Sequence, residues 1–304
     1  MSVPGGAPGR SALPYDAITV IGAGTMGRGI AIAALRAGYD VTIVDVSSDA
    51  LARAGSTISE HLTRHPPGDE DPRPGQLSTS TVIEDAAAGA GAVIEAVPEI
   101  LALKQEIFGR LVGAPAGTLL VTNTSTMSIG ELARACGGSP AVVGMHFFNP
   151  AHRMPLVEVV VADSTSSWSR DGAVALARSL GKEPVVVRDV PGFVTSRLGL
   201  LLGTEAMRMV EEGVASAADV DTAMKLGYRH PMGPLELADL VGLDARLNNL
   251  RSMRERTGNP AYEPPAILVD LVERGRLGRK SGHGFFVYDD ESHRPDQHAQ
   301  GRRA

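Results

Sequence analysis

The stretch from Ala17 to Asp45, AITVIGAGTMGRGIAIAALRAGYDVTIVD, decides the fold. Ala17 to Ile21 has the continuous apolar character of a buried strand, Arg28 to Ala37 is typical of a helix, and Val41 to Val44 follows as a second short strand. The order predicts a strand-helix-strand unit, in which the helix connects two parallel strands.

Six residues join the first strand to the helix: Gly22, Ala23, Gly24, Thr25, Met26 and Gly27. In this pattern Gly22 makes the tight turn, Gly24 lets a cofactor pyrophosphate approach the backbone, and Gly27 allows close packing of helix on strand. The free amides at the helix N-terminus then bind the diphosphate. This segment therefore predicts a dinucleotide-binding site.

Asp45 ends the second strand, where its carboxylate can accept hydrogen bonds from the ribose hydroxyls of the adenosine half. The same carboxylate would repel a 2′-phosphate, so the sequence favours NAD over NADP. Asp45 could also cap the helix that begins near Ser48, and the two roles are compatible.

Composition restricts the class of protein. The chain has 304 residues, which is enough for about two domains, and its net charge of −6 does not favour a nucleic-acid binder. No apolar run approaches the ~20 residues that span a bilayer, so no membrane association is expected. The single cysteine, Cys136, is typical of a reducing cytoplasm and is expected to be a core residue. His61 and His65 lack the accompanying residues of a metal motif, and no metal site is predicted.

His146 and Glu158 follow or lie on two short buried strands, Val142 to Met145 and Val157 to Val161. The turn between these strands could bring the two side chains together, and a histidine oriented by a carboxylate is a general acid/base unit. A core histidine beside a strand-edge glutamate is the alternative that this pair leaves open.

Polar residues follow the other predicted strands. In an open parallel sheet, ligands bind beyond the carboxyl ends of the strands, and Glu99, Ser125, His146 and Asn149 all lie at that edge. Ser125 could instead be a helix cap at a strand exit.

The strand signal nearly ends after Val187, and helices predominate from Val194 to Arg274. We therefore expect a disordered arm over residues 1–14, a dinucleotide-binding domain over 15–190, an all-helical domain over 191–288 and a disordered tail over 289–304. The run Leu198 to Leu202 is so apolar that it must be buried on most sides, partly by a second copy of the chain if the protein is a dimer.

Seven motifs in order make the chain resemble the L-3-hydroxyacyl-CoA dehydrogenases, especially the bacterial 3-hydroxybutyryl-CoA type. The motifs are GAGTMGRGIA, VIEAVPE, NTSTMSI, GMHFFNPAHRMPLVEVV, PGFVTSRL, HPMGPLELADLVGLD and GRKSGHGFFVY. The resemblance implies a Rossmann-like domain followed by a helical dimerisation domain, and hydride transfer between NAD and a (3S)-3-hydroxyacyl thioester.

The resemblance also implies roles for single residues. His146 would be the catalytic acid/base and Glu158 its partner, while Ser125 would bind the substrate near the nicotinamide. The residues that match the family's NAD contacts are Asp45, Glu99, Lys104 and Asn149.

Two departures from the family pattern concern the substrate. Ser196 stands where the family carries an asparagine near the substrate carbonyl, and it offers one hydrogen-bond donor instead of two. The family's helical hairpin with its coenzyme A contacts is replaced by the proline-rich segment Pro66 to Gly75, expected to be a mobile surface loop, and no lysine precedes Lys104. Arg64 and Arg73 are the nearest cations in the sequence.

Several functions therefore stay open at this point. The carrier of the acyl group could be coenzyme A or an acyl carrier protein, whose acidic face would need basic residues such as Arg64, Arg73 or Arg153. The substrate could also be a non-thioester hydroxy acid, or the chain could be a binding protein that retained NAD affinity without catalysis.

Overall fold

The computed structural model describes residues 14–66 and 73–288, and the chain divides into two compact units between Phe193 and Val194. Of the arm expected over residues 1–14 only Pro14 is described, and the tail over 289–304 and most of the loop from Pro66 to Gly75 lie outside the described residues.

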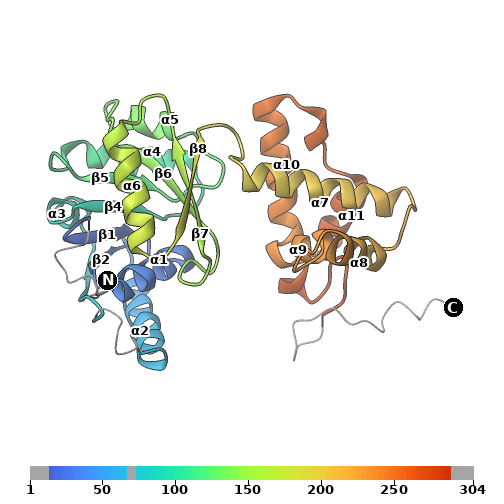
Figure 1. The fold of residues 1–304 in the computed structure, drawn as a ribbon, viewed down its shortest axis with the longest axis horizontal. Coiled ribbons are helices and arrows are strands. Elements are labelled where there is room, and N and C mark those ends of the chain that lie inside the picture. The colour runs from blue at the N-terminus through green and yellow to red at the C-terminus, as the bar shows by residue number, and fades with distance from the viewer. Residues whose placement is uncertain (1–13, 67–72, 289–304) are drawn as a thin grey trace, which may run out of the picture. The chain divides into compact units, whose positions relative to one another are not determined.

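The first unit is built on one sheet with the strand order β3-β2-β1-β4-β5-β6-β7-β8 (Figure 1). The strands are β1 (Ala17–Ile21), β2 (Asp40–Val44), β3 (Leu77–Ser80), β4 (Ala92–Glu95), β5 (Leu119–Thr122), β6 (Val142–Phe147), β7 (Leu156–Val161) and β8 (Glu183–Arg188). Every residue of β4 and β5 is buried, as expected for central parallel strands that are covered on both faces.

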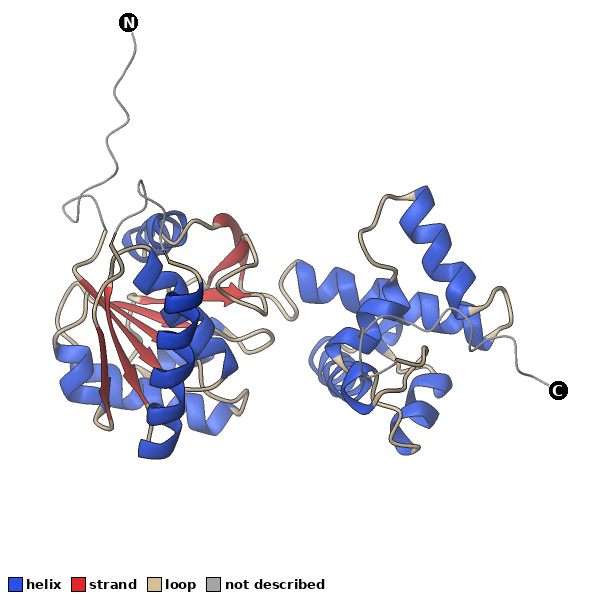
Figure 2. Cartoon of the chain, turned by 90° about the horizontal axis from the view of Figure 1, so that it is seen from below, coloured by secondary structure: helices blue, strands red, loops and turns tan. Residues whose placement is uncertain are grey.

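Helices cover both faces of this sheet (Figure 2). They are α1 (Thr25–Arg36), α2 (Ser48–Arg64), α3 (Ile83–Ala88), α4 (Leu101–Arg110), α5 (Ile129–Ala135) and α6 (Ser167–Ser179). One apolar core lies between the sheet and α1, α2 and α6, and a second lies between the sheet and α3, α4 and α5. Cys136 belongs to the second core and is buried, as predicted.

Strand β7 runs antiparallel to β6, which the parallel sheet expected from the sequence did not include. The segment between these strands has no helix and is too short for a crossover, so the strands form a hairpin. Strand β8 is parallel to β7 and forms the edge of the sheet.

The second unit is helical and has a core of its own. Its helices are α7 (Thr195–Glu211), α8 (Ala217–Gly227), α9 (Pro234–Val241), α10 (Leu243–Thr257) and α11 (Ala266–Glu273). The fold class is therefore the predicted one, a Rossmann-like domain followed by a helical domain.

Helix α7 is less covered than the sequence indicated. Leu200 is buried in the core, but Leu198 is 64% exposed and Leu202 is 37% exposed in the single chain. In the single chain only one face of the helix packs on its own domain, so burial of this run on most sides depends on a second copy and stays a prediction.

Asp239 connects α9 to the end of the described chain. Its carboxylate is buried and accepts hydrogen bonds from the backbone amides of Phe285 and Phe286, both at 3.0 Å, and from the hydroxyl of Tyr288 at 3.0 Å. Burial raises the pKa of Asp239 from 3.8 to about 6, although these three donors favour the charged form. Between pH about 4 and about 6, the folded chain therefore keeps a proton on Asp239 that the unfolded chain has lost.

We expect this proton to make the second unit more stable in mild acid. The contribution of Asp239 is complete below pH about 4 and is lost as the pH rises through about 6, with a size of roughly 3 kcal/mol. The free energy of unfolding in urea, measured from pH 4 to 7 at one protein concentration, should show this decline in the wild type. The decline should be missing in Asp239→Asn, and parallel curves for the two proteins would contradict the assignment.

Candidate active site

The turn between β1 and α1 has the backbone that its glycines predict. Gly22 has φ +109°, and an ideal Cβ there would lie 2.7 Å from the carbonyl oxygen of Ala96. A Cβ on Gly27 would lie 1.8 Å from the carbonyl oxygen of Gly22, so only glycine fits at either position. Nothing lies within 4 Å of a Cβ on Gly24, which leaves the backbone open on that side to a ligand.

A cavity of about 500 Å³ opens beside this turn. Its lining residues are Gly22, Ala23, Gly24, Thr25, Met26, Arg28, Asp45, Ala50, Arg53, Ala96, Val97 and Pro98. The cavity wall thus contains Asp45 and every residue of the glycine turn except Gly27. These residues fit a dinucleotide with its diphosphate at the turn and its adenosine ribose at Asp45, as the sequence predicted. Arg28 and Arg53 were not among the predicted contacts, although Arg28 directly follows the last glycine of the pattern.

Asp45 is held in place at the end of β2 by two backbone amides. Its carboxylate accepts from Ala23 N at 2.9 Å and from Ser47 N at 3.0 Å. The N-cap of α2 is Ser47, whose Oγ accepts from Ala50 N at 3.2 Å. Asp45 therefore does not cap the helix, and its carboxylate remains on the cavity wall.

His146 and Glu158 are directly opposite each other in the β6–β7 hairpin. His146 Nδ1 lies 2.8 Å from Glu158 Oε2, with His146 8% exposed and Glu158 1% exposed. Because the ionised carboxylate can only accept, Nδ1 carries the proton of the neutral ring, and Nε2 is the nitrogen that can accept one. The rings of Phe148 and Phe193 pack against the imidazole, with centroids at 4.5 and 5.9 Å.

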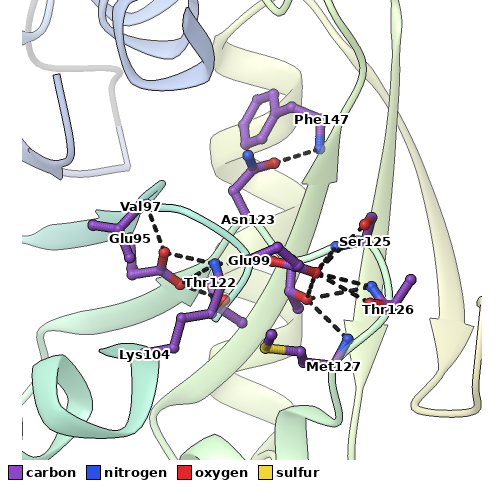
Figure 3. Close-up of polar contacts among 11 residues, drawn as sticks. Glu95, Val97, Glu99, Lys104, Thr122, Asn123, Ser125, Thr126, Met127 and Phe147 are labelled. Atoms are coloured by element: carbon purple, nitrogen blue, oxygen red, sulfur yellow. Dashed lines mark hydrogen bonds and ion pairs between the residues drawn. The ribbon is translucent and has the colours of Figure 1, made fainter. Parts of the chain in front are cut away.

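Glu99 organises the loop that follows β5 (Figure 3). Its carboxylate accepts from the Thr124 hydroxyl, from Ser125 N at 2.9 Å and from Thr126 N at 3.2 Å. Burial would raise the pKa of Glu99, but the charge of Lys104 and the hydrogen bonds from Thr124 and Ser125 hold it below its ordinary value. The carboxylate is thus ionised and tied to the backbone around Ser125.

Lys104 lies behind Glu99 with no exposed surface (Figure 3). Its Nζ is 2.7 and 2.9 Å from the two carboxylate oxygens of Glu95 and 3.2 Å from Glu99 Oε2. Glu95 also accepts from Val97 N at 2.8 Å and from the Thr122 hydroxyl at 2.7 Å. With its three donors engaged, Lys104 can act on a cofactor only through Glu99.

Asn123 connects this loop to the strand of His146, because its Oδ1 accepts from Phe147 N at 3.0 Å (Figure 3). Neither Asn123 nor Glu95 was singled out from the sequence. Each lies in a motif in which another residue was assigned the function. The signal for both was a polar residue at the end of a buried strand.

The remaining predicted site residues are less constrained. Asn149 is exposed, just after β6, and is followed by Pro150 through a cis peptide bond. Ser196 lies in the first turn of α7, in the second unit. The roles of both residues remain predictions.

Within residues 14–66 and 73–288 no group of His, Cys, Asp or Glu side chains has the arrangement of a metal site. No helix of the same residues is long and apolar enough to span a membrane.

Known proteins match both units of the chain. The model of the 3-hydroxyacyl-CoA dehydrogenase NAD-binding domain matches residues 17–190, and that of the C-terminal domain matches residues 192–288. A probable 3-hydroxybutyryl-CoA dehydrogenase of Bacillus subtilis is 39% identical over 282 residues, covering 90% of this chain and 98% of the relative. The mitochondrial hydroxyacyl-coenzyme A dehydrogenase of Mus musculus is 40% identical over 284 residues, covering 89% of this chain and 90% of the relative.

Solved structures give the same result. The (S)-3-hydroxybutyryl-CoA dehydrogenase of Ralstonia eutropha superposes with a TM-score of 0.84 at 34% identity, covering 91% of this chain and 100% of the other. Both domain models, in order, thus cover the chain with the glycine turn, Asp45 and the His146–Glu158 pair in place. The chain belongs to the 3-hydroxyacyl-CoA dehydrogenase family and is an NAD-dependent oxidoreductase.

Proposed function

We propose that this enzyme interconverts (3S)-3-hydroxyacyl and 3-oxoacyl thioesters of coenzyme A, with a short acyl chain such as 3-hydroxybutyryl. The observation that carries the chemistry is the buried 2.8 Å hydrogen bond between His146 Nδ1 and Glu158 Oε2. The names of bacterial relatives at 38–39% identity support the short acyl chain and coenzyme A. They do not favour a carrier protein, a non-thioester substrate or a non-catalytic role.

In the oxidation direction, His146 Nε2 accepts the proton of the substrate 3-hydroxyl. Glu158 keeps the imidazole in the tautomer with Nδ1 protonated and stabilises the imidazolium that forms. NAD, when bound, supplies the acceptor for the hydride that leaves C3. The glycine turn and Asp45 bind the cofactor, with Asn149 at the same edge of the sheet.

Ser125 donates a hydrogen bond to the substrate oxygen on which charge develops. Glu99 supports this assignment, because it fixes the backbone of Ser125 through the amides of Ser125 and Thr126, while the Ser125 hydroxyl makes only a long contact of 3.4 Å with the same carboxylate. Lys104 supports Glu99 in turn.

We also propose that the enzyme is a homodimer through its helical unit. Val194, Leu198, Leu202 and Met209 are all at least 37% exposed and recur along one face of α7, and Leu240 and Val241 extend apolar exposure onto α9. An apolar stripe on a helix indicates a face that is covered in the assembled protein. A second copy of the chain supplies that cover.

Changing His146 to Gln should lower kcat by at least about 10³ because the proton acceptor is lost. Glu158→Gln should lower kcat by about 10² or more, because the amide can present a donor to Nδ1 and favour the wrong tautomer. Steady-state kinetics on 3-hydroxybutyryl-CoA measures both effects, while NAD affinity should stay within about twofold of the wild type. Glu84→Gln, at a surface ion pair with Arg110, is the matched control. Turnover near that of the wild type in His146→Gln would refute the mechanism.

Asp45→Ala should weaken NAD binding by about tenfold and reduce the preference for NAD over NADP, because the acceptor for the ribose hydroxyls and the repulsion of a 2′-phosphate are both removed. Fluorescence titration with the two cofactors measures this change. Asp49→Ala, in the first turn of α2 and outside the cavity, should change neither affinity. An unchanged cofactor preference in Asp45→Ala would show that another residue sets it.

Leu198→Glu should convert the dimer to a monomer, because a charge is then buried in the apolar interface. Sedimentation analysis at micromolar concentration measures the mass. Val112→Glu places the same charge at an exposed position of the first unit and should leave the dimer intact. A dimer that persists in Leu198→Glu would exclude α7 from the interface.

A further inference from the structure

Three imidazoles meet where the last turn of α2 approaches the loop between β6 and β7. The rings of His61 and His65 are stacked with centroids 4.5 Å apart, and the ring of His152 meets that of His61 edge-on, also at 4.5 Å. His65 Nδ1 lies 3.1 Å from the carbonyl oxygen of His61, which fixes one ring nitrogen as a donor. We call these residues the histidine cluster.

The charges nearest the histidine cluster are positive. Arg36 at the end of α1 donates to the carbonyl of His65 at 3.3 Å, and Arg153 follows His152 in the loop. Lys182, just before β8, donates to the carbonyl of Met154 at 2.9 Å.

The described carboxylates on the neighbouring elements are engaged or exposed. Glu60 on α2 is paired with Arg64 at 2.7 Å. Asp40 at the start of β2 accepts from Gln76 N, and Glu183 at the start of β8 is exposed. Asp69, Glu70 and Asp71 follow in the sequence and lie outside the described residues.

Burial and these charges favour the unprotonated forms of His61 and His152. Burial, followed by the charges of His152, His65, Arg36 and Arg153, lowers the pKa of His61. Burial, followed by the charges of Arg153, Lys182, His65 and Arg36, lowers the pKa of His152. A negative ligand among these groups would reverse the effect, since it favours the protonated rings.

His152 also has an unsatisfied group. Its Nδ1 is buried and has no hydrogen-bond partner in the described chain. Buried polar atoms are nearly always paired, so this nitrogen needs a partner that the chain does not provide. The surrounding positive charge repels a metal ion and attracts an anion. A phosphate dianion offers enough acceptor oxygens for several imidazole and guanidinium donors.

We propose that His61, His65 and His152, together with Arg36 and Arg153, bind a phosphate dianion and take up protons when it binds. The source of the phosphate is the coenzyme A carrier of the substrate or a free phosphate. The first source rests on the proposed function. This chain has no lysine before Lys104, and the histidine cluster with Arg36 and Arg153 would supply the cations that bind an anionic carrier.

The loop that carries His152 and Arg153 also follows His146 in the hairpin, and Ala151 in the same loop packs on Gly29 of α1. The phosphate site is therefore built on the connection between the proposed catalytic strands. Because binding requires proton uptake, affinity for a dianion of constant charge should rise as the pH falls from 8 to 6.

The test uses sulfate, whose charge does not change in this range, with the full-length enzyme. Histidine ring signals in NMR are titrated with pH in the absence and presence of sulfate. Saturating sulfate should raise the pKa of His61 and His152 by about one unit, which corresponds to about tenfold tighter binding to the protonated ring. His283, whose pKa is lowered by burial and by Arg276 in the second unit, is the internal control and should not respond.

The variants His152→Asn and Arg153→Ala should each weaken sulfate binding at pH 6 by about tenfold. Arg170→Ala, an exposed arginine of α6, should not. If sulfate leaves the pKa of both histidines unchanged, there is no anion site and the proposal is overturned.

Kinetics then identifies the source of the phosphate. With coenzyme A as the source, Arg153→Ala raises KM for 3-hydroxybutyryl-CoA about tenfold and leaves KM for the thioester of 3′-dephospho-coenzyme A unchanged. An equal rise of KM for both thioesters would assign the site to the diphosphate of coenzyme A, whereas an unchanged KM for both, with sulfate binding intact in the wild type, would assign it to a free phosphate. If the wild type oxidises neither thioester but still binds sulfate, the proposed function fails and the anion site stands.

Discussion

The ammonium of Lys104, buried between Glu95 and Glu99, is the constraint on which the site depends. A charge without exposure requires a counter-charge, and removing one member of such a set leaves another unpaired at a cost of about 3–5 kcal/mol. Glu95 fixes the end of β4 and, through Thr122, the end of β5. Glu99 in turn fixes the loop of Ser125, because its carboxylate accepts a hydrogen bond from Ser125 N. A buried ion pair thus sets the edge of the sheet where the ligands bind.

The β6–β7 hairpin is the second constraint, because an antiparallel pair places opposite residues side by side. That register brings His146 next to Glu158 without any long-range loop. Asn123 connects the hairpin to the Ser125 loop through Phe147 N. The His146–Glu158 pair and the Ser125 loop are therefore held by strands and strand ends of one sheet, which preserves their spacing better than separate loops would.

Much of this was predictable because the information is local. The glycine turn requires Gly22 and Gly27 for steric reasons that any sequence with that turn must meet, and Asp45 follows at the end of the next strand. The exposed stripe on α7 and the order β3-β2-β1 were not predictable in the same way. Both features depend on which helix faces and strands pack against each other. The pattern of hydrophobic residues along the chain does not specify which elements those are. The sequence predicted a cofactor contact for Lys104 and did not predict its burial. That burial depends on Glu95 and Glu99 meeting around Lys104 in space.

The two departures from the family pattern do not involve the residues of these two constraints. Ser196 lies in the first turn of a helix of the second unit and α2 ends at Arg64, whereas the Glu95–Lys104–Glu99 charges and the hairpin are formed by other elements of the first unit. Groups that bind the carrier of a substrate need only supply charge near its phosphates, and imidazoles with guanidinium groups can replace a lysine there. The proton-transfer pair has no such freedom, because a shift of 1 Å at His146 would cost about 10² in rate. We therefore expect the chemistry to depend on the sheet, and the proposed recognition of the carrier to depend on side chains that can be exchanged without unfolding it.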